Sequence, residues 1–491
     1  MKQASFSVSK NLGTHISSLK HFLKRLRGSF ALMTLQERRL FYFSISIFVG
    51  LSLHWANEAY MNNTEPVPGD GGTYREAVFG EIKYINPILA SSDAEDSVSK
   101  LLFSGLVKFE NEKIVPDLAE SWNISPDGLL YSFQLRENLT FSDGEPLDAE
   151  DVVYTIEKIK DPLFKSPLYD PWKDVEVTAN SEKEIVFKLK NSYGPFIYNC
   201  DIGILPSHLL DQEFNKKFTG SGPFKYKKAK TVDNKIVELQ LERNENYYAE
   251  KAHIDKVVLS YFSDQGSTEK AYGDRKFNGI FGVPVSSNSF NFKSSKRLAL
   301  IANLRNAFLK DKVNREKLLG EGSFDEPQKF TLVTLDAPLQ RSKVEEIKEE
   351  FSGRNVDLEI VFKNAVDIQS YLKDKDFDLL LYGFNFNRDR DPYAFWHSSQ
   401  TSNFAGLANK EMDVLIEDAR MLQDTVERNK KYDAFYSFVD TEYIAKFYSP
   451  VEYLFGIKGD LKGATVAEDI EAGSRYQKIN QWYFKEKRIK K

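Results

Sequence analysis

Hydrophobic and polar positions follow a clear order in the stretch 101–162. An apolar run at its start is interrupted by Gly105, and residues 129–135 alternate apolar and polar side chains with a period of two. That alternation predicts a strand with one buried face. The Asp-Gly pairs at 127–128 and 143–144 predict a tight turn on each side of the strand, because glycine tolerates the positive φ that such turns need.

A helix is predicted directly after the second turn. Asp148 is a favourable N-cap residue, and Asp151 lies in the first turn, where the helix dipole stabilises negative charge. The apolar positions that follow recur at helical spacing and predict one buried face: Val152, Val153, Ile156 and Ile159. Turn, strand, turn and capped helix are typical of an α/β protein.

A long apolar segment precedes this region. Residues 1–39 hold eight Lys and Arg and a single acid, and an apolar segment follows at 40–61. About twenty helical residues reach roughly 30 Å, enough to cross a bilayer. A cleaved signal peptide is the alternative, but the basic leader is long and His54-Trp55-Ala56 is a poor cleavage site. An uncleaved anchor is favoured, with the basic segment in the cytoplasm and the rest of the chain outside the cell.

The remainder of the chain continues the α/β pattern. A Pro/Gly-rich linker is predicted at 62–72 and a helix at 304–318. Residues 377–383 form an apolar run typical of a strand covered on both faces. Two amphipathic helices are predicted around 412–422 and 427–447. The charged tail 485–491 is expected to be a solvated end.

Composition excludes several classes of protein. A length of 491 residues indicates two or three domains, and a net charge of −5 argues against nucleic-acid binding. Cys200 is the single cysteine, so an intrachain disulfide and a zinc site built from cysteine pairs are both excluded. The sequence contains no catalytic signature, and a lone histidine such as His397 is expected to be packed or on the surface rather than a metal ligand.

Four ordered motifs carry a resemblance to a known family. They are SGLV, PDLAESW, SPDGLLYSFQLR and FSDGEPLDAEDVVYTI, all within residues 104–156. They resemble the family 5 extracellular solute-binding proteins, the peptide-binding components of ABC importers. The resemblance implies an α/β, two-lobed fold of the periplasmic-binding-protein type, class II, preceded by the transmembrane helix. We expect lobe I to comprise 71–263 plus 445–485, and lobe II to comprise 264–444.

The candidate site lies in the loop after the apolar run 377–383. A plain surface loop is the alternative, but its aromatic side chains, Phe384 and Trp396 among them, are costly to leave in water. In the family this loop contacts the peptide backbone through Gly-Trp and pairs an Asp with the peptide α-amino group. The resemblance therefore implies ligand contacts at Gly383, Phe384, Asn385 and Trp396, with Asn387 or Asp389 in the amine-anchoring position. On the opposite lobe it places Ser104, Gly105 and Leu106 along the peptide, as an added strand.

These features predict a membrane-anchored, monomeric binding protein that captures peptides outside the cell and delivers them to the membrane subunits of an ABC permease. No catalysis, cofactor, metal or nucleic acid is expected. Three alternatives stay open: a receptor for another solute such as a chelated metal or an oligosaccharide, a ligand sensor without a transport role, and a hydrolase using Asp389 and Asp391. The last lacks a positioned nucleophile or metal.

Overall fold

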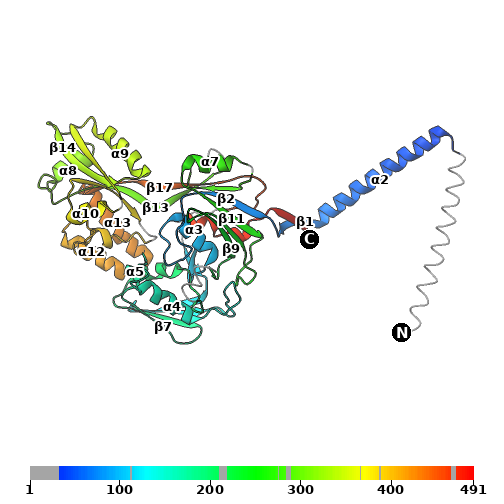
Figure 1. Cartoon of the computed structure of the whole chain (residues 1–491), viewed down its shortest axis with the longest axis horizontal. Coiled ribbons are helices and arrows are strands. Elements are labelled where there is room, and N and C mark those ends of the chain that lie inside the picture. The colour runs from blue at the N-terminus through cyan, green and yellow to red at the C-terminus, as the bar shows by residue number, and fades with distance from the viewer. Residues whose placement is uncertain are drawn as a thin grey trace. The chain divides into compact units, whose positions relative to one another are not determined.

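The computed structural model describes residues 33–110, 113–209, 218–274, 276–283, 289–364, 366–385, 389–465 and 472–491. The chain divides into two compact units (Figure 1). One unit comprises residues up to Val67 together with Glu486–Lys491, and the other comprises Pro68–Lys485.

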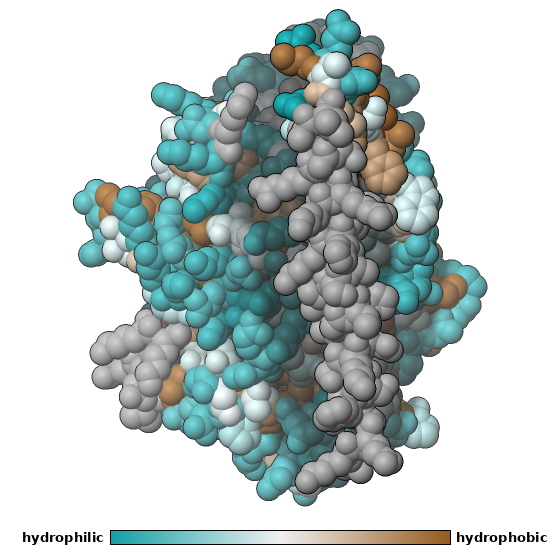
Figure 2. Space-filling view, turned by 90° about the vertical axis from the view of Figure 1, so that its right-hand side faces the viewer, coloured by the Kyte–Doolittle hydropathy of each residue, from teal (hydrophilic) through white to brown (hydrophobic). Residues whose placement is uncertain are grey.

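The first unit contains one long helix, α2, over Leu35–Asn63. Thr34 and Glu37 form a capping box that starts it, which is earlier than the predicted boundary at residue 40. None of its residues is buried, and 13 of the 26 exposed large hydrophobic side chains among the described residues lie on it. By length and composition α2 is able to cross a membrane. Unlike the apolar surface of α2, the described residues on the face of the molecule in Figure 2 are mostly hydrophilic.

A two-stranded sheet follows α2, where the sequence predicted a loose linker and a solvated tail. Strand β1 covers Thr64–Gly69 and pairs with β18, Lys485–Lys490. The backbone N–H of Lys491 donates to the carbonyl of Asn63 at 3.0 Å. The tail is therefore not a free end, because its backbone groups are taken up by the segment that leaves the helix.

The second unit is built on a ten-stranded mixed sheet in the order β15-β14-β16-β13-β17-β12-β2-β11-β10-β9. Most neighbours pair antiparallel, but β2 is parallel to both β11 and β12, and β14 is parallel to both β15 and β16. The strands have these bounds: β2 Thr73–Phe79, β9 Phe224–Val232, β10 Lys235–Arg243, β11 Lys256–Phe262, β12 Gly279–Phe281, β13 Ser289–Ala302, β14 Gln328–Leu335, β15 Val356–Lys363, β16 Leu379–Asn385 and β17 Ala445–Ile457.

Two smaller sheets contain most of the strands of residues 107–189. One has the order β5-β6-β8-β7, with β5 Ala119–Ile124, β6 Leu130–Leu135, β7 Val175–Ala179 and β8 Glu184–Leu189. The other pairs β3 Val107–Glu110 with β4 Lys113–Pro116. The strand predicted at 129–135 is β6, and the predicted capped helix is α4, Ala149–Lys160, with Asp148 as its N-cap. Both predictions are confirmed.

Helices cover the sheets and connect their strands (Figure 1). Beside α2 and α4, the described chain forms α3 Asp93–Leu102, α5 Tyr169–Trp172, α7 Gln265–Gly273, α8 Lys312–Leu319, α9 Pro338–Phe351, α10 Ile368–Asp374, α11 Tyr393–Trp396, α12 Lys410–Met421 and α13 Thr425–Thr441. Three 3₁₀ helices occur as well: η1 Gly194–Asp201, η2 Ala472–Tyr476 and η3 Ile479–Gln481.

The helix predicted at 304–318 is only half formed. The structure has turns up to Asp311, which caps the short α8. The cause is local: the Asn303 and Asn306 side chains accept hydrogen bonds from backbone N–H groups two residues further on. Such Asx turns compete with helix formation. Val313, in the first turn of α8, is 56% exposed.

The hydrophobic core has separate parts at the two ends of the large sheet. One large cluster draws on residues 74–261 and 455–482, and two others draw on residues 298–445. Strands β13 and β17 run between the two groups of elements (Figure 1). The division of the chain into lobes stays a prediction. After the predicted boundary at residue 264, β12 pairs with β2, and Ile280 packs on Ala77.

A tight crossing of two backbones joins α3 to the segment before β9. The N–H of Gly222 donates to the carbonyl of Leu102 at 2.9 Å. A Cβ at Gly220 would lie 2.1 Å from the Leu102 carbonyl oxygen. Glycine is required there because a side chain would displace backbone atoms.

We therefore predict that Gly220→Ala lowers the free energy of unfolding by about 1–3 kcal/mol, the usual loss when atoms are forced into a packed interior. Urea unfolding followed by tryptophan fluorescence measures the change. The matched control is Gly353→Ala, where a new Cβ meets no atom within 4 Å. An equally small effect of both substitutions would contradict the claim that the crossing requires glycine at position 220.

Candidate functional site

The segment Ser104–Leu106 follows α3, whose N-terminus is fixed by a capping box between Ser92 and Glu95. Its backbone is largely bonded within lobe I. The carbonyl of Ser104 accepts from Ile204 N–H, that of Gly105 accepts from Leu118 N–H, and Leu106 N–H donates to Cys200. The family resemblance implied that a peptide adds here as a strand. Few backbone groups of this segment are left to pair with such a strand.

A cavity of about 400 Å³ opens beside this segment. Its described lining residues all belong to the predicted lobe I, and they include Ser104, Gly105, Lys108, Asp117 and Ala249. The predicted lobe II residues Gly383, Phe384, Asn385, Asp389 and Trp396 are not among them.

Charged pairs make the wall of this cavity polar. Lys100 Nζ lies 2.7 Å from Asp201 Oδ2, and Lys108 Nζ lies 4.0 Å from Asp117 Oδ1. Burial raises the pKa of Asp117, although Lys108 and a hydrogen bond from the Tyr248 hydroxyl act in the opposite direction. Both signs of charge are therefore available to a ligand.

On the opposite lobe, β16 presents part of its main chain. Tyr382, Gly383, Phe384 and Asn385 pair with β13 on one side. The pairing of β14 on the other side ends at Leu381. Within the described residues, the stretch 382–385 thus has no strand partner on that side. An extended chain is able to add there through main-chain hydrogen bonds.

The aromatic residues of the predicted loop form a core. The Phe384 and Trp396 side chains are 2% and 1% exposed, and their rings stack with centroids 6.0 Å apart. The expectation that these rings are not left in water holds, but they are shielded by each other and by Phe435 and Phe447. The buried rings of Phe384 and Trp396 therefore pack beneath the loop and are not exposed to a ligand in solution.

Asp389 is also inside the protein. Its Oδ1 accepts a hydrogen bond from Arg428 Nε at 2.7 Å, and both side chains are 1% exposed. Burial raises the pKa of Asp389 to about 6, while Arg428 and the Tyr432 hydroxyl act to lower it. Arg428 also donates to the Leu422 carbonyl. With its carboxylate held by Arg428, Asp389 is placed to fix the loop. Its predicted amine-anchoring role stays a proposal, and Asn387 lies outside the described residues.

The next acid, Asp391, connects the two predicted lobes. Arg420 Nε lies 2.9 Å from Asp391 Oδ2, and the Tyr193 hydroxyl donates to the same oxygen at 3.4 Å. The Arg420 guanidinium lies 4.7 Å from the Tyr193 ring and 4.1 Å from the Tyr393 ring. Since Tyr193 belongs to lobe I, this is a direct polar contact across the lobes.

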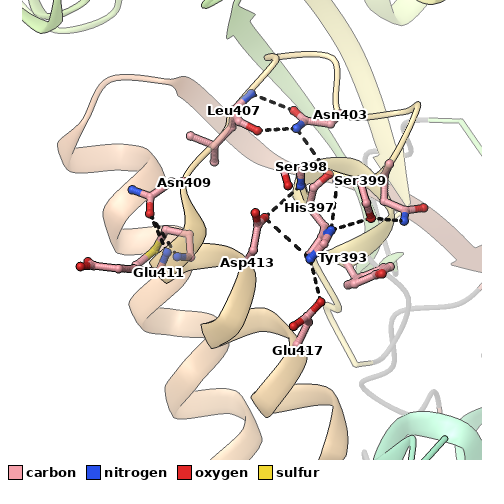
Figure 3. Close-up of polar contacts among 12 residues, drawn as sticks. Tyr393, His397, Ser398, Ser399, Asn403, Leu407, Asn409, Glu411, Asp413 and Glu417 are labelled. Carbon is pink, nitrogen blue, oxygen red and sulfur yellow. Dashed lines mark hydrogen bonds and ion pairs between the residues drawn. The ribbon is translucent and has the colours of Figure 1, made fainter.

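His397 clamps the same loop to α12 (Figure 3). The N–H of Ser399 donates to its Nδ1 at 3.2 Å, and its Nε2 lies 3.1 Å from Glu417 Oε1. Asp413 accepts from the N–H of Ser398 at 2.9 Å. His397 is 6% exposed and therefore packed, which is one of the two placements expected for it. The described part of the chain contains no group of three or more His, Cys, Asp or Glu able to hold a metal ion.

Comparison with known proteins relates the chain to one family. Residues 113–296 match the family model of bacterial extracellular solute-binding proteins, family 5 Middle. Over this stretch, which is less than half of the chain, the sequence is similar to the family 5 solute-binding proteins. The family is a solute-binding, non-enzymatic component of transporters.

Some of the similar proteins cover most of the length of this chain. The oligopeptide-binding protein AppA of Bacillus subtilis is 26% identical, over 78% of this chain and 87% of the relative. The ABC transporter substrate-binding protein CtaP of Listeria monocytogenes has the same fold, with a TM-score of 0.72, 21% identity, and coverage of 84% and 99%. NikZ of Campylobacter jejuni, solved in complex with Ni(L-His), gives a TM-score of 0.68, 25% identity, and coverage of 85% and 100%.

Three residues in these contacts were not predicted from the sequence: Tyr193, Arg420 and Arg428. Each is a common residue type far along the chain from its partner, and Arg428 lies 39 positions from Asp389. On α13, Arg428 is the one charged residue on the buried face, beside Tyr432, Phe435 and Val439. That pattern is visible in the sequence and indicates a buried charge. Tyr193 carried no comparable signal.

The buried pair leads to a pH-dependent prediction. Arg428→Met leaves the Asp389 carboxylate buried without its cation and should lower the free energy of unfolding by about 3–5 kcal/mol at neutral pH. The loss of Arg428 raises the pKa of Asp389 further, so at pH 5 the carboxyl is protonated in the variant and the loss should be smaller. Urea unfolding at both pH values measures it.

Arg390→Met is the control for this experiment. Arg390 pairs with Asp433 at 2.7 Å in the same loop region, but the two side chains are 40% and 63% exposed. Exposed pairs contribute less than about 1 kcal/mol. A loss for Arg428→Met that is independent of pH would show that Asp389 is not the group left uncompensated.

Proposed function

We propose that this chain captures peptides outside the cell and delivers them to an ABC permease in the membrane. The observation that carries the proposal is the match to an oligopeptide-binding protein over 78% of this chain and 87% of that relative. A match of this extent includes both predicted lobes, and so the whole binding unit rather than one shared motif.

The geometry favours a ligand held by its main chain. The free edge at 382–385 on β16 offers backbone N–H and C=O groups to an extended chain. Backbone pairing gives affinity whatever the side chains are, which suits a receptor for many peptide sequences. The cavity beside Ser104, with Lys108 and Asp117 in its wall, provides room and charges of both signs for a side chain or a chain end.

Closure of two lobes is the proposed way of holding the ligand. The hinge is β13 paired with β17, where the register shifts between Lys293 and Arg297 and again before Ala299. Contacts between the lobes support a closed form: the Tyr131 hydroxyl donates to Gln423 Oε1 at 3.0 Å, and Ser192 Oγ donates to the Met421 carbonyl at 3.3 Å.

The membrane attachment belongs to the same proposal. Helix α2 anchors the chain, the basic residues before it stay in the cytoplasm, and the binding unit lies outside as a monomer. The permease subunits are the partners in the membrane. The exposed apolar surface of α2, which none of the described residues covers, supports this arrangement.

A chelated metal is the second candidate ligand. The fold neighbour solved with Ni(L-His) is 25% identical over 85% of this chain. A chelate brings its own ligands to the metal, so a cluster of protein ligands is not required.

The test is isothermal titration of the full chain in detergent with a mixture of short peptides, and separately with Ni(L-His). Heat with peptides and none with the chelate is expected. Heat with the chelate alone would replace the peptide proposal with the second candidate.

A cavity-filling variant locates the site. Ala249 is exposed at the wall of the cavity, and Ala249→Trp should weaken peptide binding more than about tenfold, a loss of ~1.4 kcal/mol. Ala307→Trp is the matched control, because Ala307 is exposed and lies outside the described cavity lining. Equal affinity of both variants would place the ligand elsewhere.

A further inference from the structure

Strand β18 brings a group of cations to the end of the long helix. Residues 485–491 read KEKRIKK, with five basic side chains and one acid. Because β18 pairs with β1, which directly follows α2, these charges lie beside the segment that leaves the helix.

Hydrogen bonds fix this placement. Arg488 Nη2 donates to the Met61 carbonyl at 3.1 Å and to the Thr64 carbonyl at 2.8 Å, and its Nε donates to Thr64 Oγ1 at 2.9 Å. The backbone of Lys491 bonds Asn63. Arg488 therefore has a structural task, and it holds its basic neighbours against the last turn of α2.

The remaining cations point to solvent on both faces of the strand. Side chains alternate along a strand, so Lys487, Ile489 and Lys491 share one face and Lys490 lies on the other. All four are exposed, Ile489 by 44%. Within the described residues, Lys487, Lys490 and Lys491 form no ion pair. In that part of the chain, these three ammonium groups and the exposed Ile489 side chain thus have no protein partner.

The position of these lysines along the axis of α2 indicates what they contact. About twenty residues from Leu40 cross the hydrocarbon region, which ends near Tyr60, and Asn63 follows within roughly 5 Å. Trp55 and Tyr60 are 74% and 53% exposed, as aromatic residues at a membrane interface are. The ammonium groups of β18 consequently lie at the depth of lipid phosphates.

We propose that β18 is a membrane-surface element whose lysines bind the phosphate head groups of the leaflet from which α2 emerges. The inference rests on the membrane anchor of the proposed function and adds a lipid contact to it. Ile489 enters the edge of the hydrocarbon region while the flexible lysine stems carry their charges to the head groups. The contact strengthens with the anionic charge of the leaflet and weakens with salt.

The test uses the full chain in nanodiscs of phosphatidylcholine, alone or mixed with anionic phosphatidylglycerol. Amine-reactive labelling of individual lysines is followed by mass spectrometry. The labelling rates of Lys487 and Lys490 should fall about fivefold in the anionic discs, and recover in high salt. The internal reference is Lys228 and Lys230, two exposed lysines of β9, whose rates should not change.

A charge-reversal variant completes the test. Lys487→Glu with Lys490→Glu should abolish the protection of Lys491 in anionic discs, and the matched variant Lys228→Glu with Lys230→Glu should retain it. Equal labelling rates in the two kinds of disc would overturn the inference while leaving anchoring and peptide binding intact. A chain that is extracted from both kinds of disc by alkaline carbonate would overturn the anchor and this inference together. Peptide titration reports on the binding function independently.

Discussion

The pairing of β13 with β17 is the constraint on which the rest of the binding unit depends. Each strand has one end in each part of the core: Phe290 pairs with Phe455 at the lobe I end, and Ile301 pairs with Ala445 at the lobe II end. Phe455 stacks on Trp482, and Ala445 lies in the core with Phe435. A continuous ladder resists shear and its register shifts allow bending, which is what the proposed closure of the lobes requires.

Charged pairs hold the segment after β16, in the predicted lobe II. Asp389 and Arg428 are held in the interior, and Asp391 faces Arg420 and Tyr193 from lobe I. A buried ion pair is costly to break, so Arg428 holds Asp389 against α13. The outer acid of this segment is then available for a contact between lobes. In the proposed function, the free edge of β16 and the cavity beside Ser104 are the surfaces that contact the ligand.

Local signals in the sequence predicted local structure well. The cap at Asp148, the strand β6 and the buried run that became β16 all depend on neighbouring residues, whose pattern is visible along the chain. Contacts between distant residues were missed. Neither the pairing of Asp389 with Arg428 nor that of β18 with β1 has a periodic signal, since each joins positions that only the folded chain brings together. The Asx turns at Asn303 and Asn306 were also overlooked in a helical pattern.

Movement of the lobes about β13 and β17 when a peptide binds is the central claim. Spin labels at Asp170→Cys and Lys430→Cys test it most directly, because those side chains are 83% and 66% exposed on opposite lobes and the native Cys200 is buried. Pulsed electron paramagnetic resonance then measures the distance between the labels. A shift of the distance distribution by more than about 2 Å on adding peptide is predicted. An unchanged distribution at saturating peptide would contradict the account.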